Sequence, residues 1–226
     1  MAQIVSIQVG LPQTHGSDDA ENPMERTWTS SIFKYPVEGA VWMGKINIDG
    51  DKQSDLRVHG GEDKAVMVYA LEHYDYWRNI LPEIEWVNGG FGENLTVDGL
   101  NEETVCIGDV YAIGEALVEV TQAREPCWKL ARRWLLKDLT ALVDENGYSG
   151  WYVRVLKEGE IKAGMEMVLE KRPHPDWTIA YAKEVMHRSG KDPEFAAVYG
   201  RELAALPALA ESWRTWLLKK AAKADE

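Results

Sequence analysis

The chain has 226 residues, of which 45% are hydrophobic and 27% are charged, and this balance is typical of a folded protein rather than a disordered one. Its 25 basic and 37 acidic side chains give a net charge of −12, which argues against a specific nucleic-acid partner and against an anionic membrane surface. Two cysteines, the lack of a secretory signal and the lack of a long apolar run predict a cytoplasmic protein with no membrane partner.

Residues 1–172 are expected to form mostly short strands. Apolar runs rich in valine and isoleucine predict strands at residues 4–9, 41–48, 65–69, 94–97, 105–111, 117–120, 148–156 and 165–169. Helices are expected only over residues 71–80 and over residues 127–143, the second with a break in its middle. Many short strands with few helices favour an α+β fold built on a barrel or a highly curved sheet, rather than a doubly wound sheet.

Residues 173–226 are predicted to form a separate domain of three helices. Pro173 and Pro175 mark the boundary, and the whole excess of acidic side chains lies before it, because this segment carries eight side chains of each sign. The first helix is expected to end before Gly190, and the second to begin at Asp192. The third presents Leu209, Trp213, Trp216 and Leu217 at helical spacing. Balanced charge without a basic stripe favours packing over DNA reading.

The first candidate functional segment spans residues 57–66 and begins Arg57-Val58-His59-Gly60-Gly61. Adjacent glycines allow the backbone to approach a ligand and to direct amides at an anion, which Arg57, His59 and Lys64 could neutralise. The alternative is an ordinary glycine turn with solvated charges.

A second segment, residues 90–96, contains Asn94 at the entrance of a predicted strand. The amide of Asn94 both donates and accepts, which suits the edge of a heteroaromatic ligand. The alternative is a hydrogen bond from Asn94 to a neighbouring loop.

The third segment spans residues 121–130 and contains Cys127 between Arg124 and Lys129. A cysteine between two cations, at the expected start of a helix, favours the thiolate, which is both a ligand for soft metals and a nucleophile. Cys106 has apolar neighbours and is expected to be an inert core residue.

The order of these segments resembles the MOSC domain family, the C-terminal domains of molybdenum-cofactor sulfurases. The similar residues are Arg-Val-His-Gly-Gly-x-Asp-x-Ala-Val, Phe-Gly-Glu-Asn-Leu, Gly108-Asp109 and Gln-x-Arg-x-Pro-Cys-x-Lys-Leu. The similarity covers about residues 30–170, and the segment after it is similar to the three-helix (3-alpha) domain of the YiiM-like subgroup. The resemblance implies a mainly antiparallel, β-barrel-like domain over residues 1–172 that binds molybdenum cofactor, a pterin with a dithiolene and a phosphate.

The resemblance also implies roles for individual residues. Cys127 corresponds to the cysteine that supplies the protein ligand to molybdenum and is the expected catalytic residue. The residues implied in holding the cofactor are Arg57, His59, Gly60, Gly61, Lys64, Asn94, Gln122 and Arg124. No Cys-x₄-Cys-x₂-Cys set occurs, so the iron–sulfur module of some relatives is missing, and electrons are expected from a separate reductase.

The function implied by this resemblance is the reduction of small N-hydroxylated compounds, such as hydroxylaminopurines, to amines. The alternative is a non-catalytic carrier of molybdenum cofactor or of sulfur. A third hypothesis, a thiol hydrolase that uses Cys127 and His59, requires a hydrogen bond between these two side chains.

Overall fold

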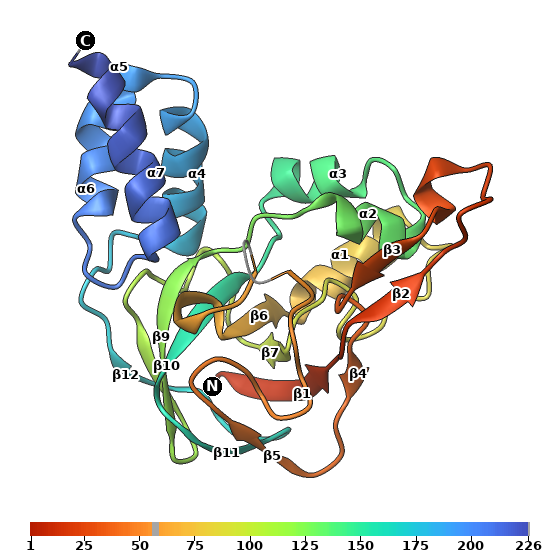
Figure 1. The fold of residues 1–226 in the computed structure, drawn as a ribbon. Coiled ribbons are helices and arrows are strands. Elements are labelled where there is room, and N and C mark those ends of the chain that lie inside the picture. Colours follow the sequence, from red (N-terminus) through yellow and green to blue (C-terminus); the bar gives the residue numbers. More distant parts are fainter. Residues whose placement is uncertain (56–58, 226) are drawn as a thin grey trace.

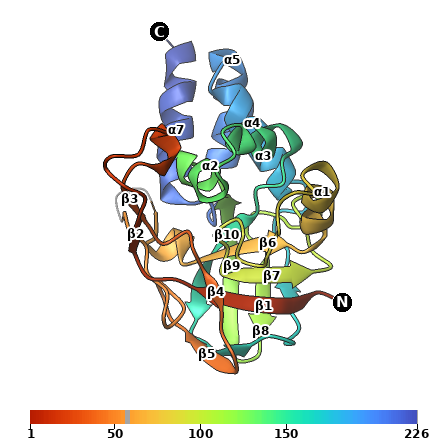
Figure 2. The ribbon, with the colours of Figure 1, turned by 90° about the vertical axis from the view of Figure 1, so that its right-hand side faces the viewer.

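A computed structural model describes residues 1–55 and 59–225. Its centre is an eight-stranded sheet that curls into a half-barrel, with strand order β12-β8-β9-β10-β6-β7-β1-β4 (Figures 1 and 2). These strands are β1 Gln3–Val9, β4 Tyr35–Pro36, β6 Val66–Ala70, β7 Leu95–Asp98, β8 Val110–Ile113, β9 Ala116–Ala123, β10 Trp151–Lys157 and β12 Val168–Lys171. Two-stranded sheets join β2 Gln13–His15 to β3 Trp28–Ser30, and β5 Ala40–Met43 to β11 Gly159–Lys162.

The predicted α+β class with a mainly antiparallel, curled sheet is confirmed. All neighbouring strands of the large sheet pair antiparallel except β6 and β7, which run parallel, with Val68 opposite Leu95. Helix α1 (Glu72–Ile80) lies between these two strands in the sequence and provides the crossover that a parallel pair requires.

Three predicted strands differ from the structure, and one of them, expected at residues 165–169, begins only at Val168 and ends at Lys171. The strand expected at residues 105–111 begins at Val110, because Asp109 accepts a hydrogen bond from the Cys106 amide and Gly108 has a φ of +84°. These features make a turn at residues 106–109. The strand expected at residues 41–48 ends at Met43, and Ile48 returns to pair with it as an isolated bridge.

The helix expected over residues 127–143 is broken as predicted. Helix α2 (Trp128–Trp134) ends at Leu135, which has the left-handed φ of +52° that closes a helix, and α3 (Leu139–Asn146) follows. Among the described residues, no helix combines the length and hydropathy that crossing a bilayer requires.

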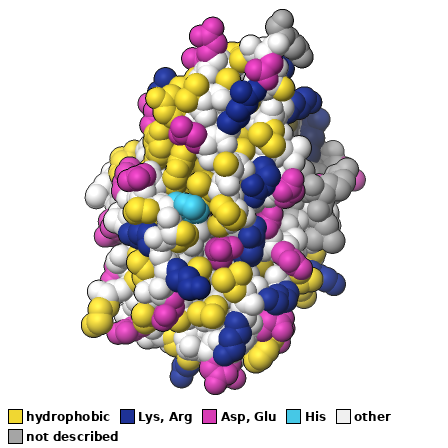
Figure 3. All heavy atoms as spheres, turned by 90° about the vertical axis from the view of Figure 1, so that its left-hand side faces the viewer, with side chains coloured by type: hydrophobic (Ala, Val, Ile, Leu, Met, Phe, Trp, Pro, Cys, Tyr) yellow, Lys and Arg dark blue, Asp and Glu magenta, His cyan; other side chains and the backbone are white. Residues whose placement is uncertain are grey.

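The C-terminal segment is helical, as expected. Helix α4 (Ile179–Ser189) is followed by a continuous helical stretch made of α5 (Pro193–Phe195), a π-helical turn at Ala196–Gly200 and α6 (Arg201–Ala204), and then by α7 (Glu211–Ala221). We call residues 173–225 the helical unit. It stands beside the ends of β9 and β10 (Figure 1). Figure 3 shows the side of the molecule that lies on the left in Figure 1, and on it acidic and basic side chains are interspersed.

The helical unit shares a hydrophobic core with the sheet. Ile179, Val185 and Trp213 are buried in the same cluster as Ile4 and Val153. The boundary predicted near residue 173 therefore falls between β12 and α4 in the sequence, although no gap in the core separates the two parts. Their assignment as two domains stays a prediction.

Candidate functional site

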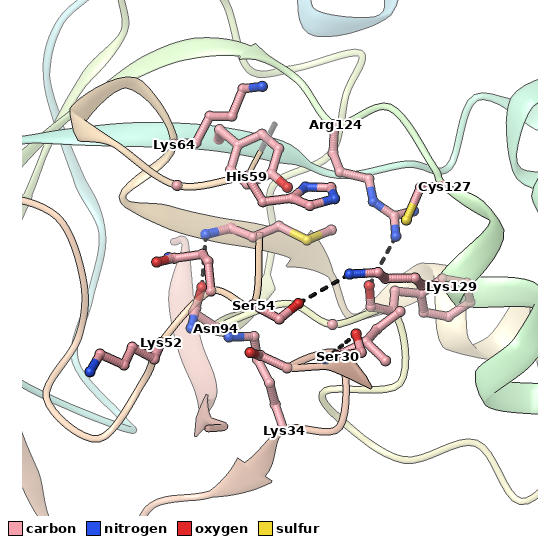
Figure 4. Close-up of a pocket in the computed structure, with 18 of the residues that line it drawn as sticks. Ser30, Lys34, Lys52, Ser54, His59, Lys64, Asn94, Arg124, Cys127 and Lys129 are labelled. Atoms are coloured by element: carbon pink, nitrogen blue, oxygen red, sulfur yellow. Dashed lines mark hydrogen bonds between the residues drawn. The ribbon is translucent and has the colours of Figure 1, made fainter. Parts of the chain in front are cut away.

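A cavity lies where the loop after β3 and the loop after β9 meet residues 52–54 and 59–60. Its lining includes Ser30, Lys34, Lys52, Ser54, His59, Lys64, Asn94, Arg124, Cys127 and Lys129, drawn in Figure 4. A groove continues from it towards the helical unit and is lined by His59, Gly60, Gly61, Lys64, Gln122, Cys127, Trp128, Met186, Ser212 and Trp216, among others. The three candidate segments of the sequence therefore meet around one site.

The cavity concentrates positive charge in an acidic protein. Lys34, Lys52, Lys64, Arg124 and Lys129 all line it. Burial and the neighbouring Lys129, Lys64 and Arg124 charges lower the pKa of His59, so its imidazole is neutral near pH 7. Burial also lowers the pKa of Lys64. This arrangement suits an anionic ligand, because a bound negative charge would relieve the repulsion among these cations.

Arg124 is the cation with the clearest unused hydrogen-bonding capacity. Its side chain is only 4% exposed, and Nη2 donates to the Phe91 carbonyl at 3.3 Å. Nη1 is buried and has no hydrogen-bond partner among the described residues. An unsatisfied buried guanidinium nitrogen is costly, and a phosphate or another anion in the cavity would satisfy it.

Cys127 lies at the junction of the cavity and the groove. It is half-buried, lines both the cavity and the groove, and is the residue directly before α2. Cys106, by contrast, is buried, and its thiol donates to the Pro175 carbonyl at 3.4 Å. Burial and the nearby Asp109 carboxylate raise the pKa of Cys106, which agrees with an inert core residue.

The loop of residues 59–64, here called the His-Gly-Gly loop, adopts a conformation that glycine permits. Gly60 and Gly61 have φ values of +90° and +81°, and a side chain at residue 60 would contact Gln53 at 3.0 Å. The His59 amide donates to the Asp55 carbonyl at 2.9 Å. Arg57, predicted to hold the cofactor, lies outside the described residues.

Two predicted cofactor residues use their side chains within the protein. Asn94 accepts a hydrogen bond from the Met67 amide at 3.1 Å and donates to the Gln8 carbonyl at 3.2 Å. Gln122 donates to the Ala123 carbonyl at 3.1 Å and accepts from the Ser212 hydroxyl at 3.5 Å. Both side chains are buried at the site, and Asn94 fixes β1 and β6 next to the cavity. Their contact with a pterin stays a prediction.

The structure adds Lys34, which the sequence did not single out, and gives Lys129, expected beside Cys127, a defined contact. Lys34 is buried, forms an ion pair with Asp51 and lines the cavity. Lys129 donates from Nζ to the Ser54 hydroxyl at 3.0 Å, which joins α2 to the segment before the His-Gly-Gly loop. The one sequence feature that could have indicated Lys34 is its position as a single lysine between apolar neighbours. Nothing in the sequence indicated that Trp216 of the helical unit lines the groove.

The side chains around the cavity provide one potential metal ligand and several cations. Within residues 1–55 and 59–225, no group of three or more His, Cys, Asp or Glu side chains is placed to hold a metal ion. Cys127 offers one soft sulfur ligand, and the cations offer contacts for an anion. The residues present therefore fit a metal that brings its other ligands with it, together with a phosphate, as molybdenum cofactor does.

The fold and this site place the chain in the MOSC domain family, whose family model matches residues 55–168. Domains of this family are associated with binding of molybdenum cofactor.

Individual relatives agree with this membership. The chain is 39% identical to the protein YflK of Bacillus subtilis over 217 residues, and this aligned region covers 96% of this chain and 93% of the relative. The crystal structure of YiiM from Geobacillus stearothermophilus has 37% identity and a TM-score of 0.78, over 97% of this chain and 99% of that one. The predicted similarity to the YiiM-like subgroup is confirmed.

A longer protein is also similar. A Gibberella moniliformis protein named Reductase is 36% identical over 161 residues, which are 70% of this chain and 28% of that relative.

Proposed function

We propose that this protein is a molybdenum-cofactor-dependent oxidoreductase that reduces N-hydroxylated compounds to amines. The observation that carries the proposal is the convergence of the half-buried Cys127 thiol with a cationic cavity in which Arg124 Nη1 has no partner among the described residues. The family membership and the reductase-named relative support the same class of reaction.

The chain's own residues would hold the cofactor through two kinds of contact. Cys127 supplies a sulfur ligand to the metal, and Arg124, Lys64 and Lys129 neutralise the phosphate. The His-Gly-Gly loop lines the groove, and its backbone can come close to the ligand because residues 60 and 61 lack side chains. Asn94 positions the cavity wall through its hydrogen bonds to two strands.

The overall reaction converts R–NHOH, two electrons and two protons into R–NH₂ and water. Molybdenum cofactor, when bound, supplies the two-electron redox chemistry. Lys64 lines both cavity and groove, and because burial lowers its pKa its ammonium is a better proton donor than an exposed lysine. A separate reductase delivers the electrons.

Two other hypotheses receive less support. No hydrogen bond joins Cys127 to His59 in the part of the chain that the structure describes, so the thiol hydrolase lacks the pairing it requires. A carrier of molybdenum cofactor would use the same cavity, and the experiment below separates it from an enzyme by turnover.

The test uses the full chain expressed in a host that makes molybdenum cofactor. We expect about one molybdenum per chain and repeated reduction of a hydroxylaminopurine with an artificial electron donor, without loss of the metal. A protein that keeps reduced cofactor but turns over neither a hydroxylaminopurine nor an amidoxime, and that passes its cofactor to an acceptor apo-enzyme, would be a carrier.

A pair of variants tests the anion contact. Arg124→Gln removes the guanidinium, and we expect a loss of about tenfold or more in bound cofactor, because one charge-assisted hydrogen bond contributes about 1.5–3 kcal/mol. Arg78→Gln is the matched control, because Arg78 is an exposed arginine of α1 that pairs with Asp75 away from the cavity. Full cofactor content in Arg124→Gln would contradict the assigned role.

A further inference from the structure

The groove beside Cys127 has one wall that comes from the helical unit. Met186 of α4 and Ser212, Trp213 and Trp216 of α7 line it together with residues of the first and third motif segments. On the other side of the sequence boundary, Trp128 follows Cys127 directly and is 53% exposed at the same groove. Three tryptophans, one from α2 and two from the helical unit, thus line the groove that Cys127 also lines.

The wall is fixed to the His-Gly-Gly loop by hydrogen bonds. Asp63 accepts from the Glu211 amide, at the start of α7, at 2.8 Å, and its other carboxylate oxygen accepts from Arg154 at 2.5 and 3.1 Å. The Thr121 hydroxyl donates to the Asp63 carbonyl at 2.7 Å, and the Ala210 amide donates to the Thr121 carbonyl at 3.2 Å. Asp63 therefore connects the sheet, the loop and α7.

Trp216 is held in place within this wall. The Trp216 ring packs against the hydrophobic core cluster and lies next to Gly190, the residue after α4, where a Cβ would be in ordinary van der Waals contact with it at 3.4 Å. The Lys220 ammonium lies 5.0 Å from the ring centroid. An indole that is half-buried and already packed against its neighbours loses little conformational entropy when a ligand binds. Its flat apolar surface therefore favours stacking with a planar ring.

We propose that the helical unit supplies the substrate-recognition wall of this protein, with Trp216 stacking on the flat ring of an N-hydroxylated heteroaromatic substrate. The inference rests on the proposed function for the reaction, and it adds the part of the chain that recognises the ring of the substrate and the residue that contacts this ring. Ser212, whose hydroxyl donates to Gln122 at 3.5 Å, also lines the groove, and its oxygen can still accept a hydrogen bond from a ring N–H. Small hydroxylamines without a ring would gain nothing from this wall.

The test compares two substrates in cofactor-loaded, full-length protein. For Trp216→Ala we expect KM for a hydroxylaminopurine to rise about tenfold, since stacking of a base on an aromatic ring contributes enough for a change of this size. KM for N-methylhydroxylamine and the molybdenum content should stay unchanged. Trp216→Phe, which keeps a flat ring, should recover most of the loss. Trp42→Ala is the control, because Trp42 is 47% exposed on β5 and is not among the residues that line the groove.

Binding of adenine, the unreactive amine product, gives a readout that does not depend on turnover. Calorimetry should show that Trp216→Ala weakens adenine binding by a similar factor and that Trp42→Ala does not. Equal KM values or equal adenine binding in wild type and Trp216→Ala would overturn the inference while leaving the proposed function intact. Adenine binding that depends on Trp216 in a protein that reduces no hydroxylamine would instead support the wall and reject the reaction.

Discussion

The two cysteines should separate metal binding from stability. Cys127 is half-buried beside a cavity, so Cys127→Ala removes few packing contacts, and we expect the free energy of unfolding to change by less than about 1 kcal/mol. Cys106 is 2% exposed and its thiol donates to a backbone carbonyl. Cys106→Ala loses this weak hydrogen bond and leaves a small void, which together cost about 1–2 kcal/mol.

The expected outcomes are therefore opposite. Elemental analysis should find molybdenum lost from Cys127→Ala and retained at about one per chain in Cys106→Ala. Thermal unfolding of the metal-free proteins should show Tm lowered by about 2–8 °C in Cys106→Ala and nearly unchanged in Cys127→Ala. Metal-replete, active Cys127→Ala would refute the ligand assignment, and metal loss in both variants would show that the assay reports folding instead.

Three further predictions concern stability. Asp51→Asn leaves the buried Lys34 ammonium unpaired, and urea unfolding should show that the free energy of unfolding falls by about 3 kcal/mol. An unchanged free energy of unfolding would mean that the ion pair does not stabilise the fold. Because the pKa of His59 is lowered in the folded protein, the unfolded chain binds the extra proton first as pH falls, so stability should decrease below about pH 6.5. His59→Asn should reduce this dependence of Tm on pH in the metal-free protein, and the exposed-site control His187→Asn should not; equal slopes would contradict the burial argument. A chain that ends at Lys171 exposes the core that faces α4 and α7 and should aggregate, and a soluble chain with the full Tm would show two independent cores.

Local signals in the sequence were enough to predict several elements correctly. The apolar run at β1, the helix α1 that ends before Pro82, and the break between α2 and α3 all depend on neighbouring residues. Hydrophobic periodicity and helix termination signals act within one or two turns of the chain, so they can be read without knowing the fold. The same holds for Cys106, whose apolar neighbours correctly indicated a buried residue.

Short strands without strong patterns were missed for a related reason. Strands β2, β3, β4 and β11 have two to four residues each, and they exist because a partner strand lies alongside them. The parallel pairing of β6 with β7 also depends on how the sheet closes. Pairing energy comes from contacts distant in sequence, which local propensity does not contain.

The sequence determined which chemical groups were available at the site. Three motif segments, ordered along the chain, predicted that Cys127, Arg124 and the His-Gly-Gly loop belong to one site, and these residues line one cavity and the groove that continues from it. The tertiary structure decided how these groups are used. It engaged both polar ends of Asn94 with backbone, left Arg124 Nη1 without a partner among the described residues, and brought Trp216 of the helical unit to the groove. These outcomes depend on contacts between segments that lie from 27 to 90 residues apart in the chain, as for Asn94 with Met67 and Gln122 with Ser212. Local propensity does not contain such contacts, and the packed core that joins the helices to the sheet fixes them.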